Sequence, residues 1–71
     1  MMEYKKVKIE TEYIKLGALL KFAGMVGDGS EAKARISLGS VRFNGEVETR
    51  RGKKVRIGDV VEMGERTVEI V

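Results

Sequence analysis

The spacing of apolar residues changes near residue 40, and this change constrains the fold more than any other feature. Before it, apolar residues between positions 16 and 36 recur at helical spacing. After it, apolar and polar residues alternate around Asn44-Gly45, the strongest two-residue turn signal in the chain. We therefore predict an α+β domain in which two short helices pack on a small, mostly antiparallel sheet.

The first helix is expected over residues 16–23, with Gly24 ending it. Its buried side would consist of Leu16, Leu19, Leu20 and Ala23. Gly17 weakens the helix, because glycine costs about 1 kcal/mol relative to alanine inside a helix.

The second helix is expected to begin at Asp28 and to stop at Gly39. Asp28 can cap it, and Glu31 can reach back to complete a capping box. Ala32, Ala34 and Ile36 would supply its buried side.

Alternation over residues 4–10 predicts an edge strand with Val7 and Ile9 facing inward. Further strands are expected at 41–43, around Val55, at 60–63 and at 67–70. A strict two-residue hairpin at Asn44-Gly45 would place Val47 on the solvent face, so we predict a bulge or longer loop there.

Length and composition limit the chemistry that this chain can perform. Its 71 residues allow one domain, 1–71, and the absence of cysteine and histidine excludes disulfides and a thiolate–imidazole zinc site. Asp28 and Asp59 are the only aspartates, and each adjoins a glycine at a predicted cap or turn. We predict a non-catalytic protein without a cofactor or small-molecule substrate.

No apolar run approaches the roughly 20 residues that cross a bilayer, and the N-terminus does not resemble a secretory signal. We expect a cytoplasmic protein that does not associate with membranes.

Gly24-Met25-Val26-Gly27 matches the G-x-x-G clamp of KH-type RNA-binding modules. KH domains need a third helix, whereas the C-terminal third of this chain is predicted to be strands. A tight connection between the two helices is the favoured interpretation of this segment.

Positive charge is concentrated in the middle of the chain. The run 50–56 contains five cations and no acid, whereas residues 57–71 are net acidic. Such a run indicates an anionic partner such as RNA, although a solvated loop is the alternative. Lys15, Lys21, Lys33, Arg35 and Arg42 could extend this patch.

Aromatic residues are few, which favours recognition of phosphates and shape over base stacking. Phe22 and Phe43 are predicted to belong to the core. The pattern does not indicate whether Tyr4 and Tyr13 belong to the core or to the surface.

Several spacings together resemble a known family. Ala32-x-x-x-Ile36-x-x-Gly39-x-Val41-x-Phe43-Asn44-Gly45, followed by Val55-x-x-Gly58-Asp59-x-Val61, is similar to the ribosomal protein S-four type RNA-binding domain. The similarity covers residues 15–62, and the run 48–54 resembles the short stand-alone YaaA/YbcJ-like members. The resemblance implies an αL-type RNA-binding fold.

The resemblance also implies an RNA-binding face at the starts of both helices and the adjoining strand loops. Lys15 stands where the family has an arginine, and Asn44 and Gly45 form the family turn. Gly17 replaces a family aspartate, and Asp28-Gly29 replaces a Ser-Arg pair at the start of the second helix. Arg35 stands at a position that is normally apolar in the family. We predict that the run 50–56 replaces the arginine missing from helix two.

These observations predict a protein that contacts structured RNA, either ribosomal or transfer RNA, in ribosome assembly or translation. The predicted RNA-binding residues are Lys15, Lys33, Arg35, Arg42, Asn44, Arg50, Arg51, Lys53, Lys54 and Arg56. The alternative is an adaptor that binds a ribosomal or other protein through the acidic C-terminal stretch. A ubiquitin-like sulfur carrier is disfavoured, because the chain does not end in Gly-Gly.

Overall fold

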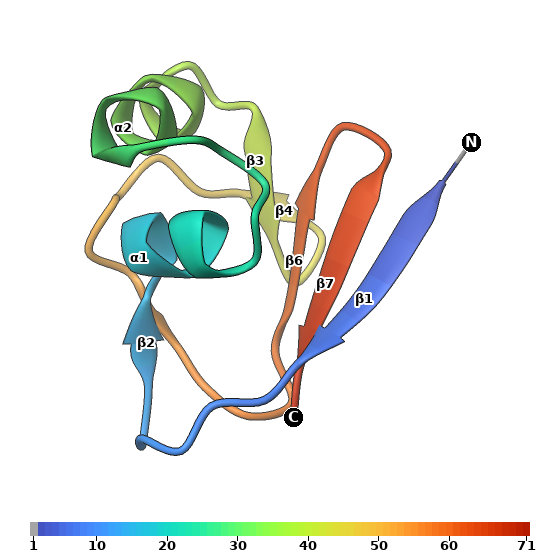
Figure 1. Cartoon of the computed structure of the whole chain (residues 1–71). Helices are drawn as coiled ribbons and strands as arrows, with labels where there is room; N and C mark the ends of the chain where they lie inside the picture. Colours follow the sequence, from blue (N-terminus) through green and yellow to red (C-terminus); the bar gives the residue numbers. More distant parts are fainter. Residues whose placement is uncertain (1) are drawn as a thin grey trace.

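A computed structural model describes residues 2–71, and Figure 1 shows two helices on one side of a five-stranded sheet. Met1, where the predicted domain begins, lies outside the described residues. The elements in chain order are β1 (Glu3–Val7), β2 (Ile14–Lys15), α1 (Leu16–Phe22), α2 (Gly29–Ser37), β3 (Val41–Phe43), β4 (Glu46–Val47), β5 (Lys54–Val55), β6 (Val60–Met63) and β7 (Arg66–Ile70). The predicted α+β fold is confirmed.

The large sheet has the order β1-β7-β6-β3-β4, and a separate two-stranded ribbon pairs β2 with β5. All neighbouring strands are antiparallel except β1 and β7, which run parallel. The predicted strand over 4–10 is observed at the sheet edge over Glu3–Val7. Val7 and Ile9 are both buried as predicted, and the Ile9 N–H bonds the Val71 carbonyl at 3.2 Å.

The core lies between the helices and the inner face of the large sheet. The four residues predicted for the buried side of α1 are all buried there. They pack with residues of α2 and of three strands, and together these core residues are Leu16, Leu19, Leu20, Ala23, Ala32, Ile36, Val41, Val61, Val68 and Ile70. Phe43 packs partly buried against this core. Two expectations were wrong, since Ala34 is exposed and Phe22 is 66% exposed on the outer side of α1.

Both ends of α2 form as the sequence predicts. The Asp28 carboxylate accepts a hydrogen bond from the Glu31 N–H at 2.8 Å. The Glu31 carboxylate reaches one residue beyond a standard capping box and accepts from the Gly27 N–H at 2.8 Å. Gly39 has a φ of +77° just past the helix end, a conformation that glycine adopts at little cost.

The connection between the helices is a packed segment. Met25 and Val26 are buried, and their N–H groups both donate to the Leu20 carbonyl oxygen, at 2.9 and 3.3 Å. Because these side chains face the core, the interpretation of this stretch as a tight connection is confirmed. Neither helix in residues 2–71 combines the length and apolar character needed to cross a membrane.

The hairpin after Phe43 corrects the predicted bulge. Phe43 pairs with Glu46 and Arg42 with Val47, so only Asn44 and Gly45 form the loop. Both loop residues have positive φ, +50° and +89°, as a type I′ turn requires. The turn therefore fixes the register. The solvent-facing Val47 is tolerated because β4 ends there and its Cγ1 lies against Gly39.

Candidate nucleic-acid interface

The loop 50–53 is attached to the start of α1 by its backbone. The Leu16 N–H donates to the Lys53 carbonyl oxygen at 2.9 Å, and the Gly17 N–H donates to the Arg51 carbonyl oxygen at 3.0 Å. The first N–H groups of a helix have no partner within the helix, so the loop satisfies two of them. This attachment brings the basic run beside α1, although more than 30 residues separate them.

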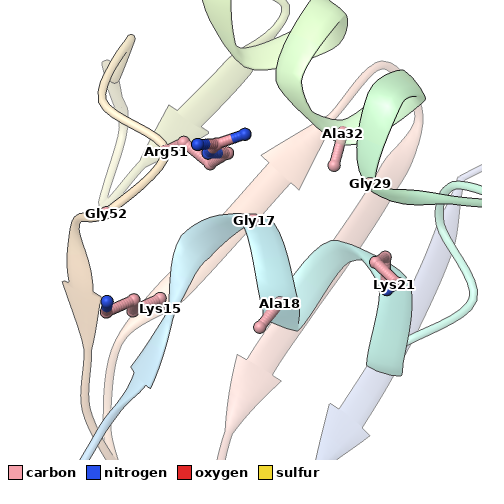
Figure 2. A pocket seen from close by; sticks show the side chains of 8 residues that line it. All are labelled: Lys15, Gly17, Ala18, Lys21, Gly29, Ala32, Arg51 and Gly52. Atoms are coloured by element: carbon pink, nitrogen blue, oxygen red, sulfur yellow. The ribbon is translucent and has the colours of Figure 1, made fainter.

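A surface pocket of about 390 Å³ lies where this loop meets the helices. Figure 2 shows the residues that line it: Lys15, Gly17, Ala18, Lys21, Gly29, Ala32, Arg51 and Gly52. We call this the helix pocket. Its three cations, Lys15, Lys21 and Arg51, form no ion pair among residues 2–71, and its lining contains no acid. The pocket therefore presents uncompensated positive charge.

Gly17 allows Arg51 to occupy this pocket. A Cβ at Gly17 would lie 2.6 Å from the Arg51 Cγ and 3.2 Å from its Cδ, so any side chain would displace that of Arg51. Figure 2 shows the guanidinium extending over Gly17 toward α2. The glycine that weakens α1 thus provides space for a cation at the pocket.

A second pocket, of about 470 Å³, adjoins the helix pocket at the same loop. We call it the loop pocket, and its lining is Arg50, Gly52, Lys53, Lys54 and Arg56. Gly52 lines both pockets, so the two pockets meet at this residue. We call the cations of both pockets the basic face: Lys15, Lys21, Arg50, Arg51, Lys53, Lys54 and Arg56.

Two aromatic rings lie beneath this face. Lys54 Nζ lies 4.9 Å from the centre of the Tyr13 ring, and the Arg56 guanidinium carbon lies 5.7 Å from it. Lys53 Nζ lies 4.9 Å from the Phe43 ring centre. These distances suit cation–π attraction, which holds flexible side chains near one position. Both rings are only partly exposed, so they support cations here and do not project outward.

Two cations of the loop pocket are paired with acids. Arg50 makes hydrogen bonds to Glu48 at 3.0 and 3.2 Å, which lower the pKa of the Glu48 carboxyl and raise the pKa of Arg50. Arg56 contacts the exposed Glu12 at 3.1 Å. Arg51, Lys53 and Lys54 have no such pair within residues 2–71 and are the freer cations of the loop.

Six of the ten predicted RNA-binding residues meet on the basic face: Lys15, Arg50, Arg51, Lys53, Lys54 and Arg56. Lys33 is exposed on α2, directly after the pocket residue Ala32. Arg35 pairs with Glu31 at 3.6 Å and lines a different pocket that contains Glu3 and Glu65. Arg42 lies on the outer face of the large sheet opposite Glu62. Arg35 and Arg42 are therefore not part of the basic face.

Asn44 is occupied within the fold. Its amide donates to the Asp59 carboxylate at 3.1 Å, and its side-chain oxygen accepts from the Val60 N–H at 2.8 Å. Asp59 also accepts from the Arg56 N–H at 2.8 Å. Asp59 therefore supports a turn, as Asp28 caps α2, and both have the structural roles that their positions in the sequence predict.

No group of three metal-ligating acids occurs within the described part of the chain.

Sequence reasoning gave Lys21 only as a possible extension, and it missed the roles of Gly17 and Tyr13. The helical pattern carried the signal for Lys21, which lies four residues after Gly17 on the same side of α1. Nothing local marked Tyr13, because its neighbours Lys54 and Arg56 lie far away in the sequence, in β5 and directly after it.

Comparison with known proteins agrees with this architecture. The chain is 44% identical over 57 residues to RlbA of Bacillus subtilis (strain 168), named as a probable ribosome maturation protein, with 80% of each chain covered. It is 36% identical over 59 residues to YbcJ of Escherichia coli (strain K12), whose name assigns it to RNA binding, with 83% of this chain and 84% of YbcJ covered.

A solved structure is also similar. The solution structure of YbcJ from E. coli, described as revealing an ALFAL motif involved in RNA binding, has a TM-score of 0.70 and 31% identity. The match covers 100% of this chain and 89% of that one. The sequence model described as the S4 domain matches residues 7–71. With two helices on a mostly antiparallel sheet and a family match over nearly its whole length, the chain belongs to the S4 domain family.

Proposed function

We propose that this protein is a non-catalytic, cytoplasmic RNA-binding protein that contacts structured ribosomal or transfer RNA through the basic face. The observation that carries the proposal is the pair of adjoining pockets lined by cations and by no acid. RNA presents regularly spaced phosphates, and lysine and arginine neutralise them with release of condensed counterions.

The arrangement favours phosphate contacts over recognition of individual bases. Arginine can hold a phosphate with two parallel hydrogen bonds, whereas lysine supplies a mobile point charge. The face offers both types from a loop held in place by backbone hydrogen bonds to α1. Contacts of this kind fix position and orientation and depend little on sequence.

The named relatives support an RNA target in the ribosome. RlbA is named for ribosome maturation and YbcJ for RNA binding, and both align with most of this chain. We infer that this protein also acts in ribosome assembly or translation.

The loop cations would take over the role of the arginine that the family has at the start of helix two. Here Asp28 occupies the cap and Gly29 follows it, so no cation stands there. Arg51 lies over α1 and lines the same pocket as Gly29, which is the first residue of α2. Arg51 would therefore supply positive charge near the start of α2 from the loop 50–53 instead of from the helix itself.

A salt series with two matched double variants tests the proposal. Structured ribosomal RNA is titrated with wild type, with Lys53→Gln/Lys54→Gln, and with the control Lys6→Gln/Lys8→Gln. Both variants remove two lysine charges, but the control removes them from around β1. We expect the slope of log K against log salt to fall by about 1 per lost phosphate contact in the loop variant alone.

Equal slopes for the two variants would argue against the basic face as the site. Absence of RNA binding by wild type at low salt would favour a protein-binding adaptor, and the acidic residues of 57–71 would then be the surface to examine.

A further inference from the structure

Two lysines, one from each pocket of the basic face, lie side by side. Lys15 lines the helix pocket and Lys54 lines the loop pocket, and the two residues are directly opposite each other in the β2–β5 ribbon. Both are exposed, whereas the next pair along the ribbon, Ile14 and Val55, packs with the core. Opposite residues of paired strands project to the same face, so both ammonium groups share one surface. Figure 2 shows the Lys15 side chain extending toward β5.

The backbone brings these two side chains as close as strand pairing allows. The Leu16 N–H donates to the Lys53 carbonyl oxygen at 2.9 Å, so this hydrogen bond flanks Lys15 and Lys54 and does not join them. Opposite residues of such a non-hydrogen-bonded pair have Cα atoms only about 4.5 Å apart, and their side chains approach more closely than those of hydrogen-bonded pairs. Two flexible lysine stems that start at this spacing can reach the same anion.

No acid compensates this pair of charges. Neither Lys15 nor Lys54 forms an ion pair within residues 2–71, and neither pocket is lined by an acid. Three cations of the large sheet instead lie opposite acids, in the pairs Arg66–Glu3, Lys6–Glu69 and Arg42–Glu62. Among the strand partners of residues 2–71, only Lys15 and Lys54 place two cations opposite each other. Like charges in this position destabilise a strand pair.

Tyr13 keeps one of the two ammonium groups near the junction. It precedes Lys15 by two residues, so its side chain lies on the same face of the ribbon, and Lys54 Nζ lies 4.9 Å from the centre of its ring. The ring engages one side of the ammonium group and leaves other N–H donors for an anion. Because the contact already restricts the Lys54 side chain, less conformational entropy is lost when an anion binds.

We propose that Lys15 and Lys54 bind a single phosphate group of the RNA between their ammonium groups. This proposal rests on the proposed function, because it specifies one point of contact within the basic face. A phosphate has enough acceptor oxygens to accept from both lysines at once. Its binding would also offset the repulsion that the two cations exert on each other in the free protein.

A salt series distinguishes one shared phosphate from two independent ones. Structured ribosomal RNA is titrated with wild type, Lys15→Gln, Lys54→Gln and the double variant of these two lysines. Each single variant should lower the affinity by about fivefold. It should leave the slope of log K against log salt nearly unchanged, because the remaining lysine still neutralises the phosphate. The double variant should lower the slope by about 1.

The control for the double variant is Lys6→Gln/Lys8→Gln, which also removes two lysine charges and should keep the slope of wild type. Two independent phosphates would give a different result. Each single variant would then lower the slope by about 1 and the double variant by about 2, and this result would overturn the proposal.

Thermal unfolding tests the lysine pair without RNA. At low salt, Lys15→Gln should raise the Tm by about 2 °C, because it removes the repulsion and leaves the contact between Lys54 and Tyr13 intact. The control Lys8→Gln removes one lysine charge outside the strand pairs and should not raise it. A Tm of Lys15→Gln at or below that of the control would contradict the repulsion on which the proposal depends.

Inorganic phosphate then serves as a probe of the site. Replacing chloride by phosphate at equal ionic strength stabilises proteins in general, so the comparison is between variants. Wild type should gain about 2 °C more in Tm than Lys15→Gln/Lys54→Gln when the phosphate concentration is near its Kd. Equal gains would show that the two lysines do not form an anion site.

These outcomes separate this inference from the proposed function. If RNA binds to wild type but the salt slopes or the phosphate effect show two independent lysines, the shared site is overturned and RNA binding stands. Failure of wild type to bind structured RNA at low salt would instead overturn the proposed function, and this inference with it.

Discussion

The Arg51 side chain occupies the space that a Cβ of Gly17 would fill, and the Gly17 N–H donates to the Arg51 carbonyl oxygen at 3.0 Å. The two residues meet at the helix pocket although they lie more than 30 residues apart in the sequence. Their contact couples a weak helix position to the placement of a cation, and it makes the first prediction possible.

Gly17→Ala should weaken RNA binding without lowering stability. The new methyl group would lie 2.6 Å from the Arg51 Cγ, so the side chain must leave its place, whereas the Arg51 carbonyl oxygen at 3.7 Å need not move. Alanine favours the helix by up to about 1 kcal/mol over glycine. We expect the salt slope of RNA binding to fall by about 1, with an unchanged or higher Tm in thermal unfolding.

The control for this prediction is Arg51→Gln, which removes the same cation directly. The double variant Gly17→Ala/Arg51→Gln should bind RNA no more weakly than Arg51→Gln alone. Additive losses in the double variant would show that Gly17 acts on binding by another route.

Arg42→Gln should affect RNA binding less than Arg51→Gln, although each variant removes one arginine charge. Arg42 lies on the outer face of the large sheet opposite Glu62, away from the basic face. We expect the salt slope to fall by about 1 for Arg51→Gln and to stay near that of wild type for Arg42→Gln. A comparable fall for both would restore Arg42 to the binding surface that the sequence predicted.

Asn44 and Asp59 should stabilise the fold as a coupled pair. Asn44 links the hairpin turn to the turn before β6 through its bonds to Asp59 and Val60, and its φ of +50° suits asparagine better than alanine. A double-mutant cycle with Asn44→Gly and Asp59→Ala, followed by urea unfolding, should give a coupling of about 1 kcal/mol. Glycine is the chosen replacement because it removes the side chain without straining the turn. Fully additive effects would contradict the link.

Glu48 should contribute stability that disappears in acid. Its hydrogen bonds from Arg50 hold the pKa of the carboxyl below its ordinary value of 4.5 in the folded protein. The contribution is therefore complete above that value and is lost as the pH falls through the lower folded pKa. Urea midpoints of wild type and Glu48→Gln should differ at pH 7 and converge as the pH is lowered below 4.5, and a constant difference would refute this role.

The same variant offers a second measurement. With Glu48 neutral, Arg50 loses its ionic partner and becomes available to phosphates. We expect Glu48→Gln to bind RNA more tightly than wild type at pH 7, with a steeper salt dependence. An unchanged slope would mean that Arg50 lies outside the contact.

Local chemistry in the sequence determined the secondary elements and the identity of most of the cations. Leucine spacing defined α1, Asp28 and Gly39 defined the ends of α2, and Asn44-Gly45 defined a turn, because each depends on residues within one or two turns of chain. The predicted bulge is absent, because the geometry of the Asn44-Gly45 turn determines the strand register even though it leaves Val47 on the solvent face. The alternation of apolar and polar residues does not show which of these two effects is stronger.

Only the tertiary structure decided which cations share a surface. Arg35 and Arg42 are as basic as Arg51 in the sequence, yet neighbouring acids and the opposite face of the sheet separate them from it. The backbone bonds from Leu16 and Gly17 to the loop 50–53 bring the two sides of the helix pocket together, and no local pattern encodes a contact across more than 30 residues. Charge is a property of each side chain, whereas a binding face depends on how distant segments pack.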